Sequence, residues 1–322
     1  MQSLSCISHI KRTENSRPPA PPTATFTHII TDRSGSMCSM NGVQIPMNKK
    51  LLDDTKEMAE KTETPTFVTF TTFDDEVEHL THNKNILDYD VPSEEELHSS
   101  LAPRGSTRFI DTVLEAIEDI ENKYEEYKKN LPRKVRALDP RIVRLINCTT
   151  DGMDNCSDHF SEDLYDAMSE FRKNGGEALL LAANMDAERI GKEFGFNSDI
   201  SLTVHASDPD AITFAFSSLR TQSQRVTSGG SAVPYTQLER QTSQAIPDSP
   251  SSDLRLLSLV PPPPLLLRQP CIRQNAILNG FSDEDDGFSQ PIPSSPPPIQ
   301  RVRRLRRSAR LMGRPQNMKI KK

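Results

Sequence analysis

The sequence has few cysteines, and they show no pattern of pairing. The five are Cys6, Cys38, Cys148, Cys156 and Cys271. They contain no CxxC pair and no metal-ligand spacing, and their odd number argues against a disulfide framework. Residues 1–22 also lack the continuous apolar stretch of a secretory signal. We therefore expect an intracellular protein, in the cytoplasm or the nucleus, with a virion as an alternative location.

Long hydrophobic runs are absent as well. No segment approaches the ~20 consecutive apolar residues that a membrane-spanning helix needs, so we expect no membrane span. The most apolar stretch of the C-terminal part, LRLLSLVPPPPLLL, is interrupted by four prolines. Apolar residues make up only 34% of the 322 residues, and 25 residues are proline. Part of the chain is therefore expected to be unfolded.

Charge and proline divide the chain into two parts of different composition. Residues 1–220 contain 24 basic and 38 acidic residues, whereas residues 221–322 contain 15 basic and 7 acidic residues and 14 of the prolines. An acidic body followed by a basic, proline-rich tail indicates a folded domain and a disordered extension. We predict a disordered leader over 1–23, a domain over 24–220 and a disordered tail over 221–322, ending in a basic segment at 301–322.

The body alternates between strand and helix patterns. Strands are predicted over 25–31, 66–73, 77–83, 141–150, 177–183 and 200–206. Helices are predicted over 47–61, 106–129, 161–176, 186–194 and 209–220. This alternation predicts an α/β fold with a doubly wound, mostly parallel sheet flanked by helices, and the close pair 66–73 and 77–83 predicts a hairpin at its edge.

Oxygen-bearing side chains are concentrated in three loops of this predicted fold. The loops are DRSGSM with Asp32, Ser34 and Ser36, GST with Thr107, and TDGMDN with Asp151. In an open parallel sheet, the loops beyond the carboxyl ends of the strands form the ligand site. The three loops are therefore expected to meet and to offer two carboxylates and three hydroxyls.

These groups are hard oxygen donors, which suit Mg²⁺, with Mn²⁺ or Ca²⁺ as alternatives. No histidine or cysteine pair in these loops has ligand spacing, which disfavours zinc and copper. Because only two carboxylates would offset the dication, such a site should keep water and accept an anionic oxygen from outside. Gly35 is expected to permit the bend that presents alternate side chains to one ion.

In their order and spacing, DRSGSM, GST and TDGMDN resemble the metal-ion-dependent adhesion site (MIDAS) of the von Willebrand factor type A (vWA) family. The resemblance covers roughly residues 24–220 and is closest to intracellular members from bacteria and large DNA viruses. It implies a vWA/Rossmann-like fold and a divalent-metal-dependent protein-binding module. It also implies that an Asp or Glu of a partner protein completes the metal coordination. The metal residues that it implies are Asp32, Ser34, Ser36, Thr107 and Asp151.

Neighbouring polar residues have simpler interpretations. Asp154 and Asn155 are expected mainly to build their turn, with support of the metal ligands as the alternative. Asn184 and Asp186 follow a predicted strand and are expected to cap the next helix.

An enzymatic role has little support in the sequence. The flanks of Ser34 differ from the GxSxG nucleophile elbow of hydrolases, and no histidine is placed to serve it. The loop of Asp32, DRSGSM, also lacks the DxDx pattern of aspartyl-phosphate phosphatases. We therefore expect the protein not to be an enzyme.

The tail gives an alternative function. Residues 301–322 contain ten basic residues, no acidic residue and no aromatic residue. Without aromatic groups for base stacking, any nucleic-acid binding would be sequence-blind and salt-sensitive. The alternative is thus a scaffold or targeting protein that acts through its proline-rich, basic tail, with a nuclear import factor or a polyanion such as nucleic acid as its partner.

Overall fold

The computed structural model describes residues 22–244, in which six strands form one sheet in the order β3-β2-β1-β4-β5-β6. The strands are β1 (Ala24–Asp32), β2 (Thr66–Phe73), β3 (Val77–Asn85), β4 (Ile142–Thr150), β5 (Glu177–Ala183) and β6 (Ser201–Val204). Neighbouring strands pair in parallel, except for β2 and β3, which form an antiparallel hairpin at one edge. The predicted fold class is therefore confirmed.

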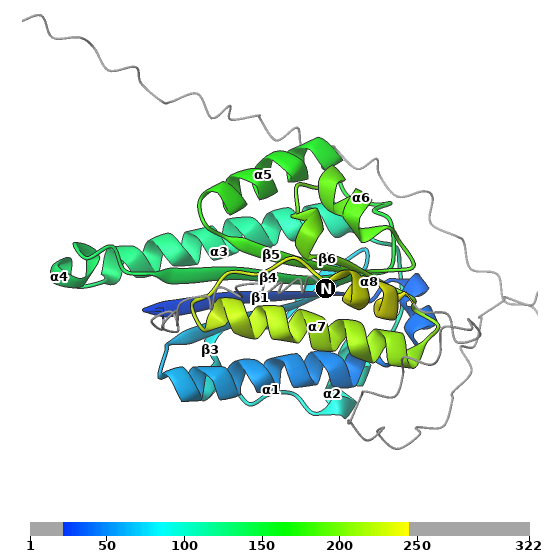
Figure 1. Ribbon diagram of the computed structural model, residues 1–322, viewed down its shortest axis with the longest axis horizontal. Helices are drawn as coiled ribbons and strands as arrows, with labels where there is room; N and C mark the ends of the chain where they lie inside the picture. The colour runs from blue at the N-terminus through cyan, green and yellow to red at the C-terminus, as the bar shows by residue number, and fades with distance from the viewer. Residues whose placement is uncertain (1–21, 245–322) are drawn as a thin grey trace, which may run out of the picture. The chain divides into compact units, whose positions relative to one another are not determined.

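Helices cover both faces of this sheet. They are α1 (Gln44–Thr62), α2 (Glu94–Ser100), α3 (Phe109–Asn130), α4 (Arg133–Arg136), α5 (Ser161–Lys173), α6 (Ala187–Glu193), α7 (Pro209–Thr227) and α8 (Gln237–Ser243). Short 3-10 helices span Gly35–Met40, Ile86–Asp88 and Ser198–Ile200. Helices α3, α5 and α6 lie on one face of the sheet, and α1 and α7 lie on the other (Figure 1).

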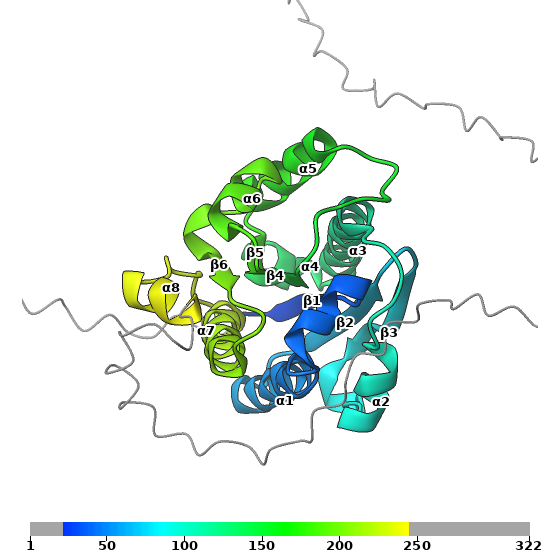
Figure 2. The same cartoon turned by 90° about the vertical axis from the view of Figure 1, so that its right-hand side faces the viewer.

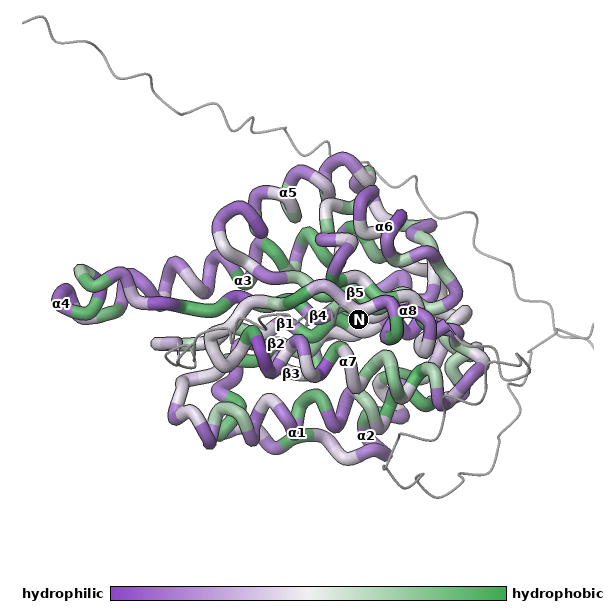
Figure 3. Tube along the Cα trace, in the orientation of Figure 1, coloured by the Kyte–Doolittle hydropathy of each residue, from purple (hydrophilic) through white to green (hydrophobic). Residues whose placement is uncertain are grey.

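The two faces of β5 show how one strand serves two hydrophobic cores. Its side chains alternate between the faces of the sheet. Leu180 packs in the cluster that contains Met168 of α5, whereas Leu179 and Leu181 pack in the cluster that contains Phe216 of α7. Burial on both faces explains the continuous apolar run of this strand. The helices, with one face toward a core, alternate between hydrophilic and hydrophobic residues (Figure 3).

The folded domain continues beyond residue 220, so the predicted domain end at 220 is too early. The apolar face of α7 extends to Val226, which is buried in the same cluster as Phe216. Tyr235 joins this cluster from the following loop. Helix α8 then packs against β6, where the His205 N–H donates a hydrogen bond to the Ser243 carbonyl (2.9 Å). These residues complete the core beside β5 and β6 and therefore fold with the domain.

Residues 1–21 and 245–322 lie outside the described range. The disordered leader and the tail with its basic segment 301–322 stay predictions, as does the alternative function assigned to that tail. Between residues 22 and 244, no helix has both the length and the apolar character required to cross a bilayer.

Candidate metal site

The three predicted loops lie at the carboxyl edge of the parallel strands. β1 ends at Asp32 and β4 ends at Thr150, and these two strands are direct neighbours with Thr31 opposite Thr149. Their end-to-end alignment brings the loops after β1 and β4 together. Figure 2 faces this edge, with the short helix that follows β1 near the centre of the view.

Backbone hydrogen bonds join the second loop to the other two. The Gly35 N–H of the first loop donates to the Gly105 carbonyl (3.3 Å), and the Asn155 N–H of the third loop donates to the Thr107 carbonyl (3.0 Å). The Asn155 side-chain oxygen in turn accepts from the Thr107 N–H (2.9 Å). The second loop is thus held between the first and the third.

The hydroxyl groups of the first and second loops lie near the carboxylate of Asp151. The Ser34 and Ser36 hydroxyl oxygens are 3.0 Å apart, and the Ser36 hydroxyl donates to Asp151 Oδ1 (2.7 Å). A Cβ at Gly152 would lie 2.8 Å from Thr107 Oγ1 and 3.3 Å from Ser36 Oγ. These hydroxyls therefore border the same small space, which stays open because residue 152 has no side chain.

Asp32 is fully buried at the base of this space. Its carboxylate accepts hydrogen bonds from the Ser34 N–H and from the Thr150 hydroxyl, both at 2.6 Å. Burial raises the pKa of Asp32 to about 6, although the hydrogen bonds from Thr150 and Ser34 oppose this rise. The negative charge of Asp151 raises the Asp32 pKa further.

Asp151 is the more accessible carboxylate. Burial raises its pKa as well, against the hydrogen bonds that it accepts from Ser36 and Ser39, the latter at 3.2 Å. Within residues 22–244, neither Asp32 nor Asp151 forms an ion pair with a basic side chain. Two partly desolvated carboxylates without a cationic partner, next to three hydroxyls, fit a divalent cation.

The structure thus brings together all five residues that the sequence motifs single out. No group of three or more His, Cys, Asp or Glu in the described part of the chain is arranged to hold a metal ion. A cation at this edge would therefore depend on hydroxyl oxygens as well as carboxylates, which is the donor set expected from the three loops. The role of these residues as metal ligands stays a prediction.

Asp154 and Asn155 do more than build a turn. Asp154 Oδ2 accepts from the Ile110 N–H in the first turn of α3 (3.0 Å) and from the Ser157 hydroxyl. Asn155 makes the two bonds to Thr107 described above. Together they fasten the loop that carries Asp151 to the start of α3, which favours the supporting role.

The two residues after β5 differ from each other. Asp186 caps α6 as predicted, because its carboxylate accepts from the Glu188 and Arg189 N–H groups. The capping prediction for Asn184 is wrong. Its side-chain oxygen accepts from the Ala206 N–H (2.9 Å) and so ties the end of β5 to the segment that follows β6.

The prediction for Gly35 is also wrong. Its φ lies outside the left-handed region, and an added Cβ would meet only the Gly105 carbonyl, at an ordinary 3.6 Å. A glycine is instead required at Gly105 in the second loop, with φ of 65° and an added Cβ 1.9 Å from Asp75 Oδ1. The close approach therefore occurs in the second loop, against the β2–β3 turn.

Two site residues were missed by the sequence reasoning. Thr150 bonds Asp32 across 118 residues of sequence, and Ser39 bonds Asp151 across 112. Thr150 directly precedes Asp151 at a strand end, and Ser39 continues the serine-rich run of the first loop. Such positions are a weak signal, since the sequence does not show which distant carboxylate each hydroxyl meets.

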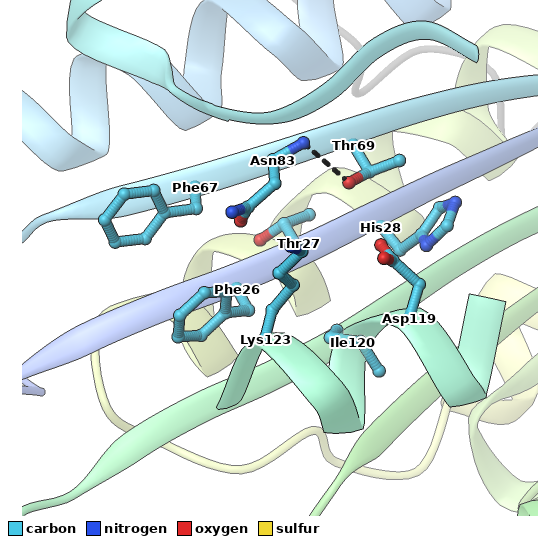
Figure 4. A pocket seen from close by; sticks show the side chains of 9 residues that line it. All are labelled: Phe26, Thr27, His28, Phe67, Thr69, Asn83, Asp119, Ile120 and Lys123. Carbon is cyan, nitrogen blue, oxygen red and sulfur yellow. Dashed lines mark hydrogen bonds between the residues drawn. The ribbon is translucent and has the colours of Figure 1, made fainter. Parts of the chain in front are cut away.

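A second polar feature lies between α3 and the strands β1, β2 and β3 (Figure 4). His28 is buried here, and its Nε2 lies 2.7 Å from the Thr71 hydroxyl oxygen. Burial lowers the pKa of His28 to about 3, against the negative charge of Asp119. His28 is therefore neutral at physiological pH and acts as a hydrogen-bonded part of the core.

Comparisons with known proteins give matches among solved structures alone. No protein-family model and no curated protein matches the chain. A von Willebrand factor type A structure from Catenulispora acidiphila is 17% identical, with 63% of this chain and 43% of that chain covered and a TM-score of 0.43. Proximal thread matrix protein 1 from the mussel byssus, with a zinc-occupied MIDAS motif, is 17% identical, with coverage of 63% and 46% and a TM-score of 0.39.

The SpRpn10 VWA domain is 14% identical, with 59% of this chain and 95% of that chain covered and a TM-score of 0.40. The chain thus spans less than half the length of the Catenulispora and mussel proteins. These identities and TM-scores carry no function over to this chain. Von Willebrand factor type A domains are among the known structures to which this chain is similar.

Proposed function

We propose that the domain is a divalent-metal-dependent protein-binding module that captures an acidic side chain of a partner protein. The residues that would hold the ion are Asp32, Ser34, Ser36, Thr107 and Asp151. Mg²⁺ is the expected ion, with Mn²⁺ and Ca²⁺ as alternatives. We further propose that the protein acts inside the cell and has no enzymatic activity of its own.

The observation that supports this function most is that three hydroxyls border one space beside Asp151 and the buried Asp32, two carboxylates that have no cationic partner within residues 22–244. Ser36 bridges the first loop to Asp151, and Asp32 holds the backbone of Ser34 in place through a buried hydrogen bond. A divalent cation bound there would supply an electrophilic centre with a position open to a carboxylate oxygen. The absence of a side chain at Gly152 keeps that space accessible.

Metal binding is tested on the full chain by isothermal titration calorimetry after treatment with chelator. Mg²⁺, Mn²⁺ and Ca²⁺ are titrated separately, and Zn²⁺ is included because the mussel protein has a zinc-occupied site. Asp32→Ala and Ser34→Ala should abolish the binding heat. Ser106→Ala is the matched control, because Ser106 is an exposed hydroxyl residue in the second loop. Equal binding by all four proteins would contradict the assignment of the site.

Capture of an acidic partner is tested by proximity labelling and pulldown with wild type and Asp32→Ala. Partners present only with wild type and Mg²⁺ should lose binding when the relevant Asp or Glu is replaced by Asn or Gln. A partner set retained in excess chelator would rule the mechanism out. Turnover of a substrate by the purified chain that disappears in Ser34→Ala would instead establish a hydrolase.

A further inference from the structure

A second charged feature lies at the opposite end of β4 from the candidate metal site. Four exposed basic residues lie in α4 and at the end of α3, and we call them, together with Leu138, the basic knob. The four are Lys129, Arg133, Lys134 and Arg136. Figure 1 shows α4 beyond the end of α3, at the left of the view and away from the edge that carries the three loops.

The cations of the basic knob have no partner in the part of the chain that the structure describes. Within residues 22–244, none of the four forms an ion pair or a side-chain hydrogen bond. The neighbouring basic residues differ, because Lys128 donates to the Tyr124 hydroxyl (3.2 Å) and Arg141 donates to the Gly230 carbonyl (3.0 Å). Arg133 and Arg136 lie three residues apart on one turn, where like charges repel. The basic knob therefore presents positive charge that the fold itself does not use.

Leu138 gives the basic knob an apolar tip. It is 81% exposed, the largest value among the exposed large hydrophobic residues of the described range. Its position is fixed by the backbone, since the Leu138 N–H donates to the Val135 carbonyl (3.0 Å) and the Asp139 N–H donates to the Arg136 carbonyl (3.2 Å). Asp139, the next residue, is exposed and acidic and offsets one of the four positive charges. A leucine held outward beside the remaining positive charge adds no stability in water, but it fits a surface with anionic groups above an apolar layer.

We propose that the basic knob docks on the surface of an anionic phospholipid bilayer, with Leu138 entering the boundary between headgroups and acyl chains. The cations would contact lipid phosphates and carboxylates, whose attraction adds up over several Lys and Arg side chains. A nucleic acid would use the same charges but not Leu138, and the exposed part of the basic knob has no aromatic side chain for base stacking. Lipid is therefore the partner that the combined charge and apolar tip favour.

This docking would leave the candidate metal site free. The nine residues of β4 separate the two features, a length of about 30 Å. A protein attached through the basic knob could therefore present its metal site toward the cell interior. The proposal does not depend on metal binding, and the two can fail separately.

The test measures partition of the full chain onto vesicles of phosphatidylcholine with and without phosphatidylserine. Because residues 301–322 are also basic, all proteins carry glutamine in place of the ten basic residues of that segment. The test variant is Arg133→Glu/Lys134→Glu/Arg136→Glu. The control, Lys50→Glu/Lys173→Glu/Lys192→Glu, makes the same change in net charge at other exposed positions.

We expect binding to phosphatidylserine vesicles that disappears at high salt, and at least about 100-fold weaker binding for the test variant than for the control. Leu138→Ser should weaken vesicle binding about 10-fold and leave binding to double-stranded DNA unchanged. Far-UV circular dichroism should show that all variants keep the fold. The proposal would be overturned if the test and control variants lost vesicle binding equally, or if Leu138→Ser bound vesicles like wild type. It would also be overturned if the basic knob supported binding to DNA but not to vesicles.

Discussion

Replacement of Asp32 by asparagine should stabilise the metal-free domain while it removes the response to metal. The buried carboxylate accepts two hydrogen bonds, from the Ser34 N–H and the Thr150 hydroxyl. An asparagine can keep both contacts, because its oxygen accepts from Ser34 and its amide donates to the Thr150 oxygen. The Thr150 hydroxyl can then donate to the Gly152 carbonyl, which lies 3.2 Å away. The substitution therefore removes a buried charge while the contacts with Ser34 and Thr150 are kept.

The size of the effect follows from the pKa of Asp32, which burial raises from 3.8 to about 6. That difference corresponds to about 3 kcal/mol of unfavourable free energy for the ionised carboxylate. Since the folded-state pKa is the higher one, the stability associated with the protonated form is complete below about pH 4 and is lost as the pH rises through about 6. The asparagine variant should match wild type near pH 4 and exceed it by up to about 3 kcal/mol at pH 7.5.

The assay is urea unfolding of the full chain in chelator, at several pH values. The sequence contains no tryptophan, so far-UV circular dichroism is the suitable signal. A second series contains Mg²⁺, which should stabilise wild type by about 2.7 kcal/mol at a concentration one hundred times its Kd. Asp32→Asn should show no such increase.

Asp151→Asn is the matched control, because this carboxylate belongs to the same site but is less buried. It should also lose the response to Mg²⁺, with a smaller gain in metal-free stability. If Asp32→Asn were less stable than wild type at pH 7.5, or if the gain were the same at pH 4, burial of an unpaired charge would not explain the pKa of Asp32.

Three further predictions concern other parts of the domain. Gly152→Ala should weaken Mg²⁺ binding at least tenfold in calorimetry, because its Cβ would displace the Thr107 hydroxyl, whereas Gly35→Ala, with ordinary contacts, should bind like wild type. The wild-type domain should lose stability between pH 6.5 and pH 3, because protonation of the buried His28 imidazole opposes folding there. His28→Gln should reduce this loss by up to about 5 kcal/mol. The same loss of stability at acid pH in urea unfolding of both proteins would contradict this. A chain that ends at residue 220 should unfold at lower urea than one that ends at 244, since burial of Val226 and Tyr235 contributes about 1.5–3 kcal/mol each.

The long elements of the fold could be predicted because each has a clear period or an unbroken apolar run. The two missed helices of seven residues, α2 and α8, are too short for a period to show. Both nevertheless begin with a capping box, formed by Ser93 with Glu96 and by Thr236 with Glu239. This local signal was present in the sequence, and at Thr236 it indicates that the domain extends past residue 220.

The candidate site could be predicted as a set of residues but not as a hydrogen-bond network. The loop ends are local features of strands and helices, and parallel strand order brings them to one edge. The partners of Thr150, Ser39 and Asn155 depend on how closely those loops approach, which is set by packing over the whole sheet. The misplaced role of Gly35 has the same origin, because the close contact occurs at Gly105 and involves a distant turn.

Two buried carboxylates near this edge show how environment separates structural from functional acids. Asp111, on the first turn of α3, is also buried, which by itself would raise its pKa. Its carboxylate, however, accepts from the Asp158 and His159 N–H groups, the His159 ring and the Arg108 guanidinium, and its pKa falls to about 2.

The hydrogen bonds that Asp32 accepts come from neutral groups of Ser34 and Thr150, and its pKa stays raised. A carboxylate already saturated by donors has little capacity for a further cation, whereas one buried with few donors and no charge partner gains the most from it. By this reasoning Asp111 fastens the loop that carries Asp151, and Asp32 is the acid that a divalent ion would stabilise. Replacement of Asp111 should therefore reduce stability first and metal affinity only through displacement of that loop.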